Sequence, residues 1–589
     1  MGNKTKIDPI LVPVIQNAFL SVCQRMGETM LRTSRSTIFS EARDFVIGLF
    51  DSKRQMIAQQ AYIPVQMGSM PFGIEAIYNE FKDNIFPGDV FILNDPYHGS
   101  NHPPDVQISR PVFWKDELRY WTVAKGHQAD TGGRGVCGYN PEAKDCWEDA
   151  VRIPVAKIYE KGIYNRDLWN MILLNLHIPF LVEGDLHCMV GATRLGERDV
   201  INLLEKFGPE LLEDAISMFL DASERYVRQE IEKMPDGIYK AEEMLDNDGV
   251  EKDKIRTVRV SVEIKGDSIT FDFSNSDPQC KGPFNATIPA TVSTVYLAFF
   301  PLVGPEVVHN AGAMRPIKVI AREGSICNAK EPAACTLNGP TLSSVMGNAV
   351  WRALVQAVPE RATAGWAYWF SPSSTGMNPR TGRPFADIHF LCVPGTGATY
   401  GFDGWDHGGN ITTLGALRAL DPELHEVTSP YTVLQYEIHP DSGGPGRWRG
   451  GHGVIARWRI EAENIRWANW GNGTREETAA FGVDGGKPGK PHFARFVRKN
   501  GSIEKIEVNS FSEVHVGDIC EIFSAGGGGF GDPYLRPAEK VLDEVINEIV
   551  SIEKAKDDYG VIIDPESLRI DYAATRKIRD KNQEHSPRT

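Results

Sequence analysis

The stretch from Asn94 to Asp130 reads NDPYHGSNHPPDVQISRPVFWKDELRYWTVAKGHQAD. It follows an apolar run, Val90 to Leu93, that predicts a buried strand. A second run, Arg119 to Ala124, predicts another strand and leads into Lys125-Gly126-His127. Polar side chains that come directly after strand ends can be aimed at one point by a rigid scaffold. The rest of the chain is therefore interpreted around this segment.

His102, Asp105 and His127 form a candidate metal site in this segment. Two imidazoles and a carboxylate are a frequent ligand set for catalytic zinc, iron or manganese. The Pro-Pro pair between His102 and Asp105 stiffens the turn and excludes a helix interior. His98 is an alternative ligand. The same side chains could instead be loop groups that bond their own backbone, and the residues alone leave both interpretations open.

Several stretches together carry a family resemblance. NDPYHGSNHPPDV, followed by a strand and GHQAD, resembles the hydantoinase B family. That family includes the B halves of N-methylhydantoinases and 5-oxoprolinases, a lactamase subunit, and the large metal-binding subunits of acetone and acetophenone carboxylases. Further matching stretches, in the same order and spacing, are SEARDFVIGLFD (40–51), VEGDLH (182–187), GPFNAT (282–287), DSGGPGRWRGGHGV (441–454) and AGGGGFGDP (525–533).

The resemblance implies a ligand set of Asp44, His102, Asp105 and His127 around one divalent ion, zinc or manganese. Without it, Asp44 beside Arg43 would be interpreted as a surface ion pair of little energetic value. Asp130 is expected to orient His127 rather than to bind the ion itself, because ligand imidazoles usually need such a partner. The site is expected to be accessible to solvent.

Composition restricts the class of protein. With 589 residues, 41% hydrophobic and 24% charged, the chain is expected to be globular and to contain about two to four domains. A net charge of −15 argues against a nucleic-acid partner. No apolar stretch is long enough to cross a bilayer, and the first residues lack a secretory signal. The nine scattered cysteines contain no C-x-x-C pair, so a cytoplasmic protein with reduced thiols is expected.

The expected fold class is α+β. Residues 1–235 are predicted to form a mixed α/β domain with the metal site, 236–425 a central α+β domain, 426–536 a β-rich domain, and 537–589 a helix and a charged, mobile tail. Helices are predicted over 8–31, 67–81, 166–176, 199–231, 291–299, 343–358 and 537–559. Strands are predicted over 45–50, 90–93, 119–124, 257–264 and 268–273, with a hairpin turn at 265–267 between the last two.

A second polar cluster runs from Phe402 to Asn410 and contains Asp-Gly-Trp-Asp-His-Gly-Gly. This form resembles the ketone carboxylase branch of the family, and His407 is predicted to be catalytic, with Asp403 beside it in the pocket. The alternative is that Trp405 and its neighbours only pack. The glycine-rich loop at 441–453 could hold an anion or form a tight crossover. No glycine-rich stretch is followed by Lys-Ser or Lys-Thr, so no nucleotide loop is expected.

The resemblance implies that a separate hydantoinase A-type subunit, with further small subunits, binds ATP and phosphorylates a small-molecule ketone or cyclic amide. The preferred function is a subunit of an acetophenone-type ketone carboxylase that acts on an enol phosphate. The alternative is the B subunit of an N-methylhydantoinase, 5-oxoprolinase or lactamase that hydrolyses a cyclic amide. A third hypothesis is a scaffold subunit with a structural metal, although structural zinc is usually enclosed by four Cys or His ligands.

Overall fold

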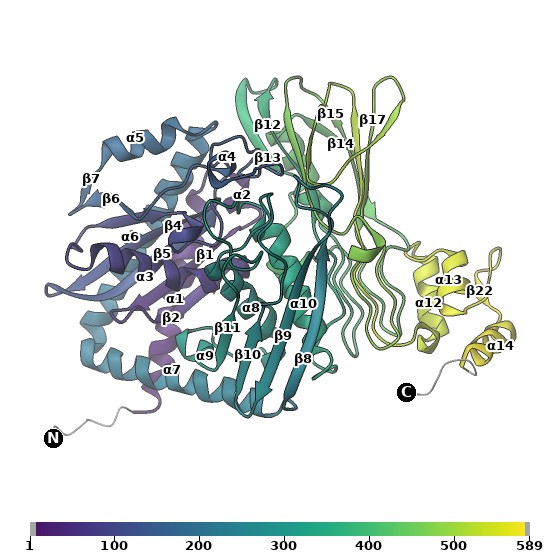
Figure 1. The fold of residues 1–589 in the computed structure, drawn as a ribbon, viewed down its shortest axis with the longest axis horizontal. Coiled ribbons are helices and arrows are strands. Elements are labelled where there is room, and N and C mark those ends of the chain that lie inside the picture. The colour runs from purple at the N-terminus through teal and green to yellow at the C-terminus, as the bar shows by residue number, and fades with distance from the viewer. Residues whose placement is uncertain (1–7, 584–589) are drawn as a thin grey trace.

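The computed structural model describes residues 8–583, and its helices and sheets form an α+β fold. In Figure 1 the N-terminal part, purple to blue, and the central part, teal, form one body. The β-rich part, in green, stands beside that body, and the C-terminal helices, in yellow, lie at its far side. One continuous hydrophobic core joins the N-terminal and central parts, which were expected to be separate domains.

The N-terminal part is built on a seven-stranded antiparallel sheet in the order β2-β1-β5-β4-β3-β6-β7. The three strands predicted in this region are present. β4 was not predicted, because Gln107, Ser109, Arg110 and Pro111 interrupt its apolar pattern. The strands are β1 (Phe45–Asp51), β2 (Met56–Ala61), β3 (Val90–Leu93), β4 (Asp105–Trp114), β5 (Glu117–His127), β6 (Ala156–Glu160) and β7 (Ile163–Tyr164).

Long helices pack on this sheet. α6 lies across β4 and β5 and also packs against α1. The single helix predicted over 199–231 is two helices, because Gly208 has a positive φ of 76° and Pro209 starts the second one. The helices are α1 (Leu11–Thr33), α2 (Thr37–Ser40), α3 (Met70–Phe81), α4 (Cys146–Asp149), α5 (Arg166–Leu174), α6 (Pro179–Phe207) and α7 (Pro209–Glu232).

The central part contains a four-stranded sheet, β11-β10-β9-β8, and two buried helices. The predicted hairpin turn is confirmed, and Gly266 provides its positive φ of 57°. α8 is fixed to the short helix η1 (Pro64–Ser69), because Ser293 Oγ accepts a hydrogen bond from the Gly68 N–H at 2.9 Å. The elements are β8 (Gly237–Leu245), β9 (Arg256–Lys265), β10 (Ser268–Asp272), β11 (Ile317–Ile320), α8 (Ile288–Val303), α9 (Ala311–Met314), η3 (Asn338–Leu342) and α10 (Ser343–Leu354).

The β-rich part consists of two sheets around their own core, in the orders β13-β12-β16-β19 and β14-β15-β20-β17-β18. Because β12 and β13 pair with later strands, the boundary expected at residue 425 falls inside this part. The elements are β12 (Phe370–Asn378), β13 (Arg383–Ile388), α11 (Pro422–Thr428), β14 (Tyr431–Ile438), β15 (Val454–Ile460), β16 (Arg466–Gly471), β17 (Phe493–Val497), β18 (Ile503–Lys505), β19 (Ser510–Ser512) and β20 (Ile519–Phe523).

Below these sheets, extended glycine-rich segments run side by side, as Figure 1 shows beneath the green strands. They bond through their backbones: Gly527 N–H donates to the Gly451 carbonyl at 2.9 Å, and Gly528 N–H donates to Gly365. A Cβ on Gly527 would lie 1.9 Å from the Thr396 carbonyl oxygen. Glycine is therefore required here by the close approach of backbones. The loop at 441–453 belongs to this tight packing.

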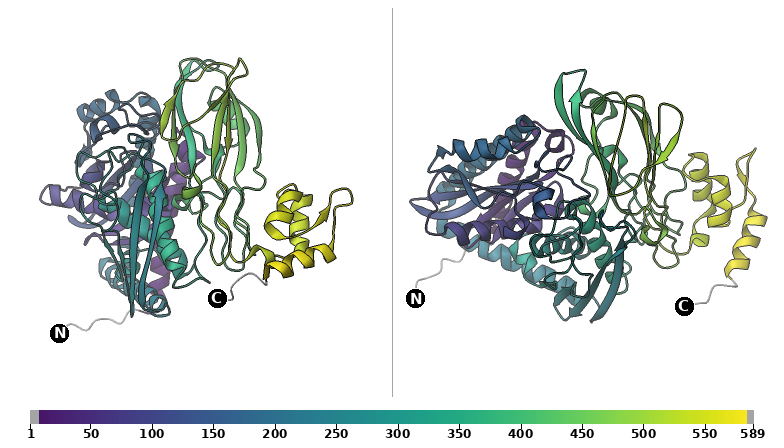
Figure 2. Two further views of the ribbon diagram at one scale, coloured as in Figure 1. Left: turned by 45° about the vertical axis from the view of Figure 1, so that its right-hand side comes forward. Right: turned by 45° about the horizontal axis from the view of Figure 1, so that its top comes forward.

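The C-terminal segment forms a small helical unit with its own core. Figure 2 shows from two further sides that it lies against the glycine-rich end of the β-rich part, away from the N-terminal sheet. The helix predicted over 537–559 is two helices, α12 (Ala538–Ile546) and α13 (Ile552–Tyr559). The charged, mobile tail expected at the end of the chain is wrong as far as residue 583, because α14 (Tyr572–Gln583) is a helix there, and 584–589 lie outside the described residues.

Candidate metal centre

Three neighbouring strands bring the predicted ligands to one end of the N-terminal sheet. β1 runs antiparallel to β5, and β5 runs antiparallel to β4. The start of β1, the end of β5 and the start of β4 therefore lie together. Asp105 and His127 are direct partners in the β4–β5 register, and His127 N–H donates to the Asp44 carbonyl at 3.0 Å.

His102, Asp105 and His127 have ligand atoms within 4.8 Å of one another. Asp105 Oδ1 lies 2.9 Å from His102 Nε2 and 3.3 Å from His127 Nδ1. Nevertheless, Asp105 Oδ1 and His127 Nε2 make no hydrogen bond within residues 8–583, although both are buried. Donor atoms about 3.3 Å apart are what a tetrahedral ion with bonds of about 2.0 Å requires. The donor set and its unpaired atoms therefore fit a divalent metal ion.

Asp44 is next to this trio but is not part of it. The group of ligand atoms within 4.8 Å of one another contains only His102, Asp105 and His127. Burial raises the pKa of Asp44 to about 6, while the charges of His127 and His102 lower it. The amide Nε2 of Gln66 donates to Asp44 Oδ1 at 2.7 Å. The predicted fourth ligand is thus close enough to interact electrostatically with the trio, and its role as a ligand remains a prediction.

The orientation of His102 is set by a segment far along the chain. His102 Nδ1 lies 2.8 Å from the Thr336 carbonyl oxygen, which can only accept, so Nδ1 carries the proton and Nε2 is free to bind a metal. The buried Asp149 carboxylate holds that segment by accepting from Cys335 N–H at 2.6 Å and Thr336 N–H at 2.8 Å. Asp149 therefore positions His102 through the backbone of Thr336.

Charge in the centre is balanced within a buried environment. Burial alone would raise the pKa of Asp105, but His102 and His127 hold it well below its usual value. Asn101 Nδ2 also donates to Asp105 Oδ2 at 2.5 Å. Lys125 lies two residues before His127 on β5 and is fully buried, and burial lowers its pKa to about 7. Its Nζ donates to Ser69 Oγ at 2.8 Å.

The centre is more enclosed than expected. His102, Asp105 and His127 are 3%, 1% and 2% exposed. The ring of Tyr139 covers His127, with centroids 5.3 Å apart. The prediction of a site open to solvent is therefore wrong for these three side chains, because the central part, including Gly339 against the His102 ring, closes over the strand ends.

Two further predicted residues do not reach the trio in the described contacts. Asp130 accepts hydrogen bonds from the N–H groups of Gly132 and Ile178 and from both the N–H and the ring of His177. Its expected bond to His127 is not among its described contacts, because the chain after His127 turns toward α6. His98 is exposed and pairs with Asp95 at 2.9 Å instead of joining the trio.

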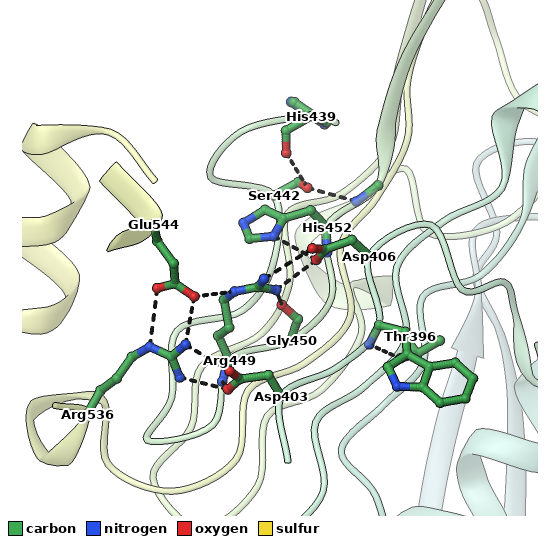
Figure 3. A network of polar contacts seen from close by, with 12 residues as sticks. Thr396, Asp403, Asp406, His439, Ser442, Arg449, Gly450, His452, Arg536 and Glu544 are labelled. Carbon is green, nitrogen blue, oxygen red and sulfur yellow. Dashed lines mark hydrogen bonds and ion pairs between the residues drawn. The ribbon is translucent and has the colours of Figure 1, made fainter. Parts of the chain in front are cut away.

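His407 follows Asp406, one of the residues of the polar network in Figure 3, and its N–H donates to the His452 carbonyl at 2.7 Å. Its Nε2 is 2.9 Å from the Tyr436 hydroxyl, and burial lowers its pKa to about 4. Asp403 accepts two hydrogen bonds from Arg536, at 2.7 and 2.9 Å. Arg449 bonds Asp406 and Glu544. These contacts give the polar cluster at 402–410 and Arg449 a role in packing. The catalytic role of His407 remains a prediction, and no described contact joins His407 to the trio.

Several supporting residues were not identified from the sequence. Gln66, Asn101, Thr336 and Asp149 each touch a predicted ligand or the group that holds one. Lys125 had a usable signal, since residues two apart on a strand share a face and His127 lies two positions later. Gln66 and Asp149 act across 22 and 187 positions, which no local pattern predicts, whereas Asn101 lies only four positions before Asp105.

Comparison with known proteins places these features in a family. The Hydantoinase B/oxoprolinase profile matches residues 8–533. The chain belongs to the hydantoinase B/oxoprolinase family. The family resemblance predicted from the sequence motifs is thus confirmed, and the α+β fold is the one this family shares with the solved structures below.

Individual family members are similar over nearly their whole length. The caprolactamase subunit beta of Pseudomonas jessenii is 34% identical, with 97% of this chain and 99% of that protein covered. The crystal structure of the ATP-dependent caprolactamase from the same organism matches with a TM-score of 0.90 at 32% identity, covering 98% of this chain and 100% of the other. A nucleotide-free acetone carboxylase matches with a TM-score of 0.92 at 20% identity, covering 98% and 83%, and shows the shared fold.

Two further expectations concern the cysteines and the absence of a membrane-spanning segment. All nine cysteines are buried free thiols. Between residues 8 and 583, the helices include none with the length and apolar character needed to cross a membrane.

Proposed function

We propose that this chain is the metal-binding B-type subunit of an ATP-dependent enzyme that hydrolyses a cyclic amide. The observation that carries the proposal is the similarity, over nearly the full length of both chains, to a caprolactamase subunit beta, together with the meeting of His102, Asp105 and His127 at one point. A scaffold role is disfavoured, because structural zinc is usually enclosed by four Cys or His ligands, whereas this set contains a carboxylate.

The ketone carboxylase preferred from the sequence has less support. That preference rested on the motif at 403–409, whose carboxylates are engaged by Arg536 and Arg449. A motif that holds the glycine-rich segments to α12 does not discriminate between substrates. The acetone carboxylase is 20% identical, a level that speaks for the fold and not for the reaction.

In the proposed reaction, ATP is bound by a separate partner chain, which phosphorylates the amide. A divalent ion, when bound, would supply a Lewis acid that stabilises negative charge on oxygen and lowers the pKa of water. His102 would contribute Nε2, because Thr336 occupies its Nδ1. Asp105 would contribute Oδ1, because Asn101 occupies its Oδ2. Asp44, held by Gln66, would contribute its second carboxylate oxygen.

The surrounding residues would exclude bulk water and keep these groups rigid. Tyr139 and Gly339 cover the two imidazoles. Because the trio is almost fully buried, the substrate must be delivered through an opening made when the partner chain is bound, and the free chain is expected to be inactive.

The test is to purify the chain together with a hydantoinase A-type ATP-binding chain and to follow two reactions. We expect ATP-dependent ring opening of a lactam or hydantoin. ATP-dependent fixation of bicarbonate onto a ketone, without ring opening, would overturn the proposal in favour of the carboxylase.

A second arm addresses the scaffold hypothesis. His102→Gln should remove both the metal and ring opening, whereas His515→Gln, at an exposed histidine far from the trio in sequence, should change neither. Activity that survives the loss of metal in His102→Gln would mean that the ion is only structural.

A further inference from the structure

A second buried cluster of metal-ligating groups lies inside the β-rich part. Asp387 is in β13, His389 follows that strand, and His425 is in α11. Their ligand atoms all lie within 4.8 Å of one another, and His425 Nδ1 is 3.2 Å from Asp387 Oδ2. The three residues are 4%, 0% and 1% exposed. Residues from separate elements thus converge here as they do in the first centre.

One polar atom of each residue in this cluster lacks a hydrogen-bond partner. Asp387 Oδ2, His389 Nδ1 and His425 Nε2 are buried and make no hydrogen bond within the described chain. A buried polar group without a hydrogen-bond partner destabilises the fold, so three in one place require an explanation. A purely structural histidine looks different: His492 uses both ring nitrogens, one with the Tyr368 carbonyl at 2.7 Å and the other with the Ala525 N–H at 3.0 Å.

The two imidazoles are held firmly. His389 Nε2 lies 3.0 Å from Ser374 Oγ, which also accepts from the Tyr431 hydroxyl at 2.6 Å. The His389 ring stacks on Trp458 at 4.8 Å, and the His425 ring stacks on Tyr431 at 5.4 Å. With His389 Nε2 bonded to Ser374, its Nδ1 remains for another partner. Such hydrogen bonding and stacking of the far side of the ring is typical of metal-binding imidazoles.

Charge also points to a cation. Within residues 8–583, His425 is the only partner with which Asp387 forms an ion pair, and that pair is charged only if the imidazole is protonated. A buried carboxylate is expensive unless a positive charge accompanies it.

A cleft lies next to the chain segments that carry the cluster. It has a volume of about 480 Å³, and its lining includes Phe385 and Ala386, which precede Asp387, and Val427 and Thr428, which follow His425.

We propose that Asp387, His389 and His425 bind a second divalent transition-metal ion, of the zinc and cobalt class, separate from the ion of the first centre. Two imidazoles and a carboxylate suit such borderline ions better than calcium or magnesium, which prefer oxygen ligands. The ion would tie α11 to β13, and this role does not depend on the proposed reaction.

The test is the metal content of the full-length chain loaded with zinc and passed through a desalting column. We expect about two equivalents per chain in the unaltered protein, and about one in either Asp387→Asn or His102→Gln, because each variant empties one centre. His492→Gln, which replaces a buried imidazole that is fully hydrogen-bonded, is the matched control and should retain about two. One equivalent in the unaltered protein, or two in Asp387→Asn, would overturn the proposal.

A second measurement requires no variant and covers the case in which Asp387→Asn fails to fold. Crystals of the unaltered chain grown with cobalt, and measured at the cobalt absorption edge, should give an anomalous peak among Asp387, His389 and His425 as well as one at the first centre. An anomalous peak at the first centre alone would refute a second site.

Discussion

His102 and Thr336 are 234 positions apart, yet the ring Nδ1–H of one donates to the backbone carbonyl of the other at 2.8 Å. The N-terminal sheet supplies the ligand, and the central part decides which of its nitrogens is available. A metal centre on the first third of the chain therefore depends on correct packing of residues that follow much later.

Asp149→Asn should weaken metal binding without removing any ligand. The carboxylate accepts from two N–H groups and from Thr336 Oγ1 at 2.5 Å, and an amide NH2 would face donors with a donor. The Thr336 carbonyl would shift, and affinity for zinc should fall by about 10- to 100-fold, measured by competition with a chelator.

Asp145→Asn is the control for this prediction. Like Asp149, Asp145 accepts from two backbone N–H groups, but these belong to α4, and Asp145 is not bonded to Thr336. Asn caps a helix about as well as Asp, so this variant should leave both stability and zinc affinity nearly unchanged. Equal losses of affinity in both variants would show that the effect of Asp149→Asn does not depend on its contact with Thr336.

Gly339→Ala should displace the His102 imidazole. A Cβ at this position would lie 2.7 to 2.9 Å from three atoms of that ring, closer than real contacts allow. We expect zinc affinity to fall by at least about tenfold, with the far-ultraviolet circular dichroism unchanged. Gly191→Ala, in the exposed face of α6 with open space around it, should instead raise stability by about 0.5–1 kcal/mol. Unaltered zinc affinity in Gly339→Ala would contradict the close packing described for this ring.

Stability should fall as the solution becomes acidic, partly through His492. Burial lowers the pKa of this imidazole to about 4, whereas an unfolded histidine titrates near about 6.5. The unfolded state therefore binds the extra proton first, so the contribution is complete above about pH 6.5 and is lost as pH falls toward 4, by about 3 kcal/mol in all.

The measurement is the urea midpoint of the chain from pH 7.5 to 4.5, compared with that of His492→Gln. Glutamine can offer an amide N–H to Tyr368 and a carbonyl to Ala525 but does not titrate. The variant should show a shallower loss of stability at acid pH. This comparison isolates His492 from Asp149, whose pKa is raised to about 7 by burial and whose effect has the opposite sign. Parallel curves for the two proteins would refute the assignment.

Glu544→Gln should loosen the C-terminal helices. Glu544 accepts from both Arg449 and Arg536, each almost fully buried, so the change leaves two guanidinium groups short of negative charge (Figure 3). Breaking such a buried pair costs about 3–5 kcal/mol. Limited trypsin digestion should release the segment after Arg536 faster than in Asp543→Asn, a neighbouring exposed carboxylate on α12. Identical digestion rates would show that α12 is held by its apolar face alone.

The sequence predicted the parts of the centre that depend on local pattern. His102 and Asp105 are joined by a stiff turn, and His127 ends a strongly apolar strand, so their neighbourhood could be inferred from spacing and family resemblance. β4 was not predicted because it contains polar residues that are buried only once the sheet has formed. Asp149 was not identified from the sequence, because it meets Thr336 only in the folded chain. The cluster of Asp387, His389 and His425 has no signature in the sequence, since His425 lies 38 positions after Asp387 and meets it only through the packing of α11.

The glycine-rich segments beneath the β-rich part have a consequence for how this chain can change over time. At Gly526, Gly527 and Gly528 even a methyl group would lie 1.9 Å from a carbonyl oxygen of the adjacent segment. One segment cannot shift to make room without moving its neighbours, because each is hydrogen-bonded on more than one side. Single substitutions of these glycines are expected to be removed by selection. Sequence differences between homologues should accumulate at cleft-lining and exposed positions instead.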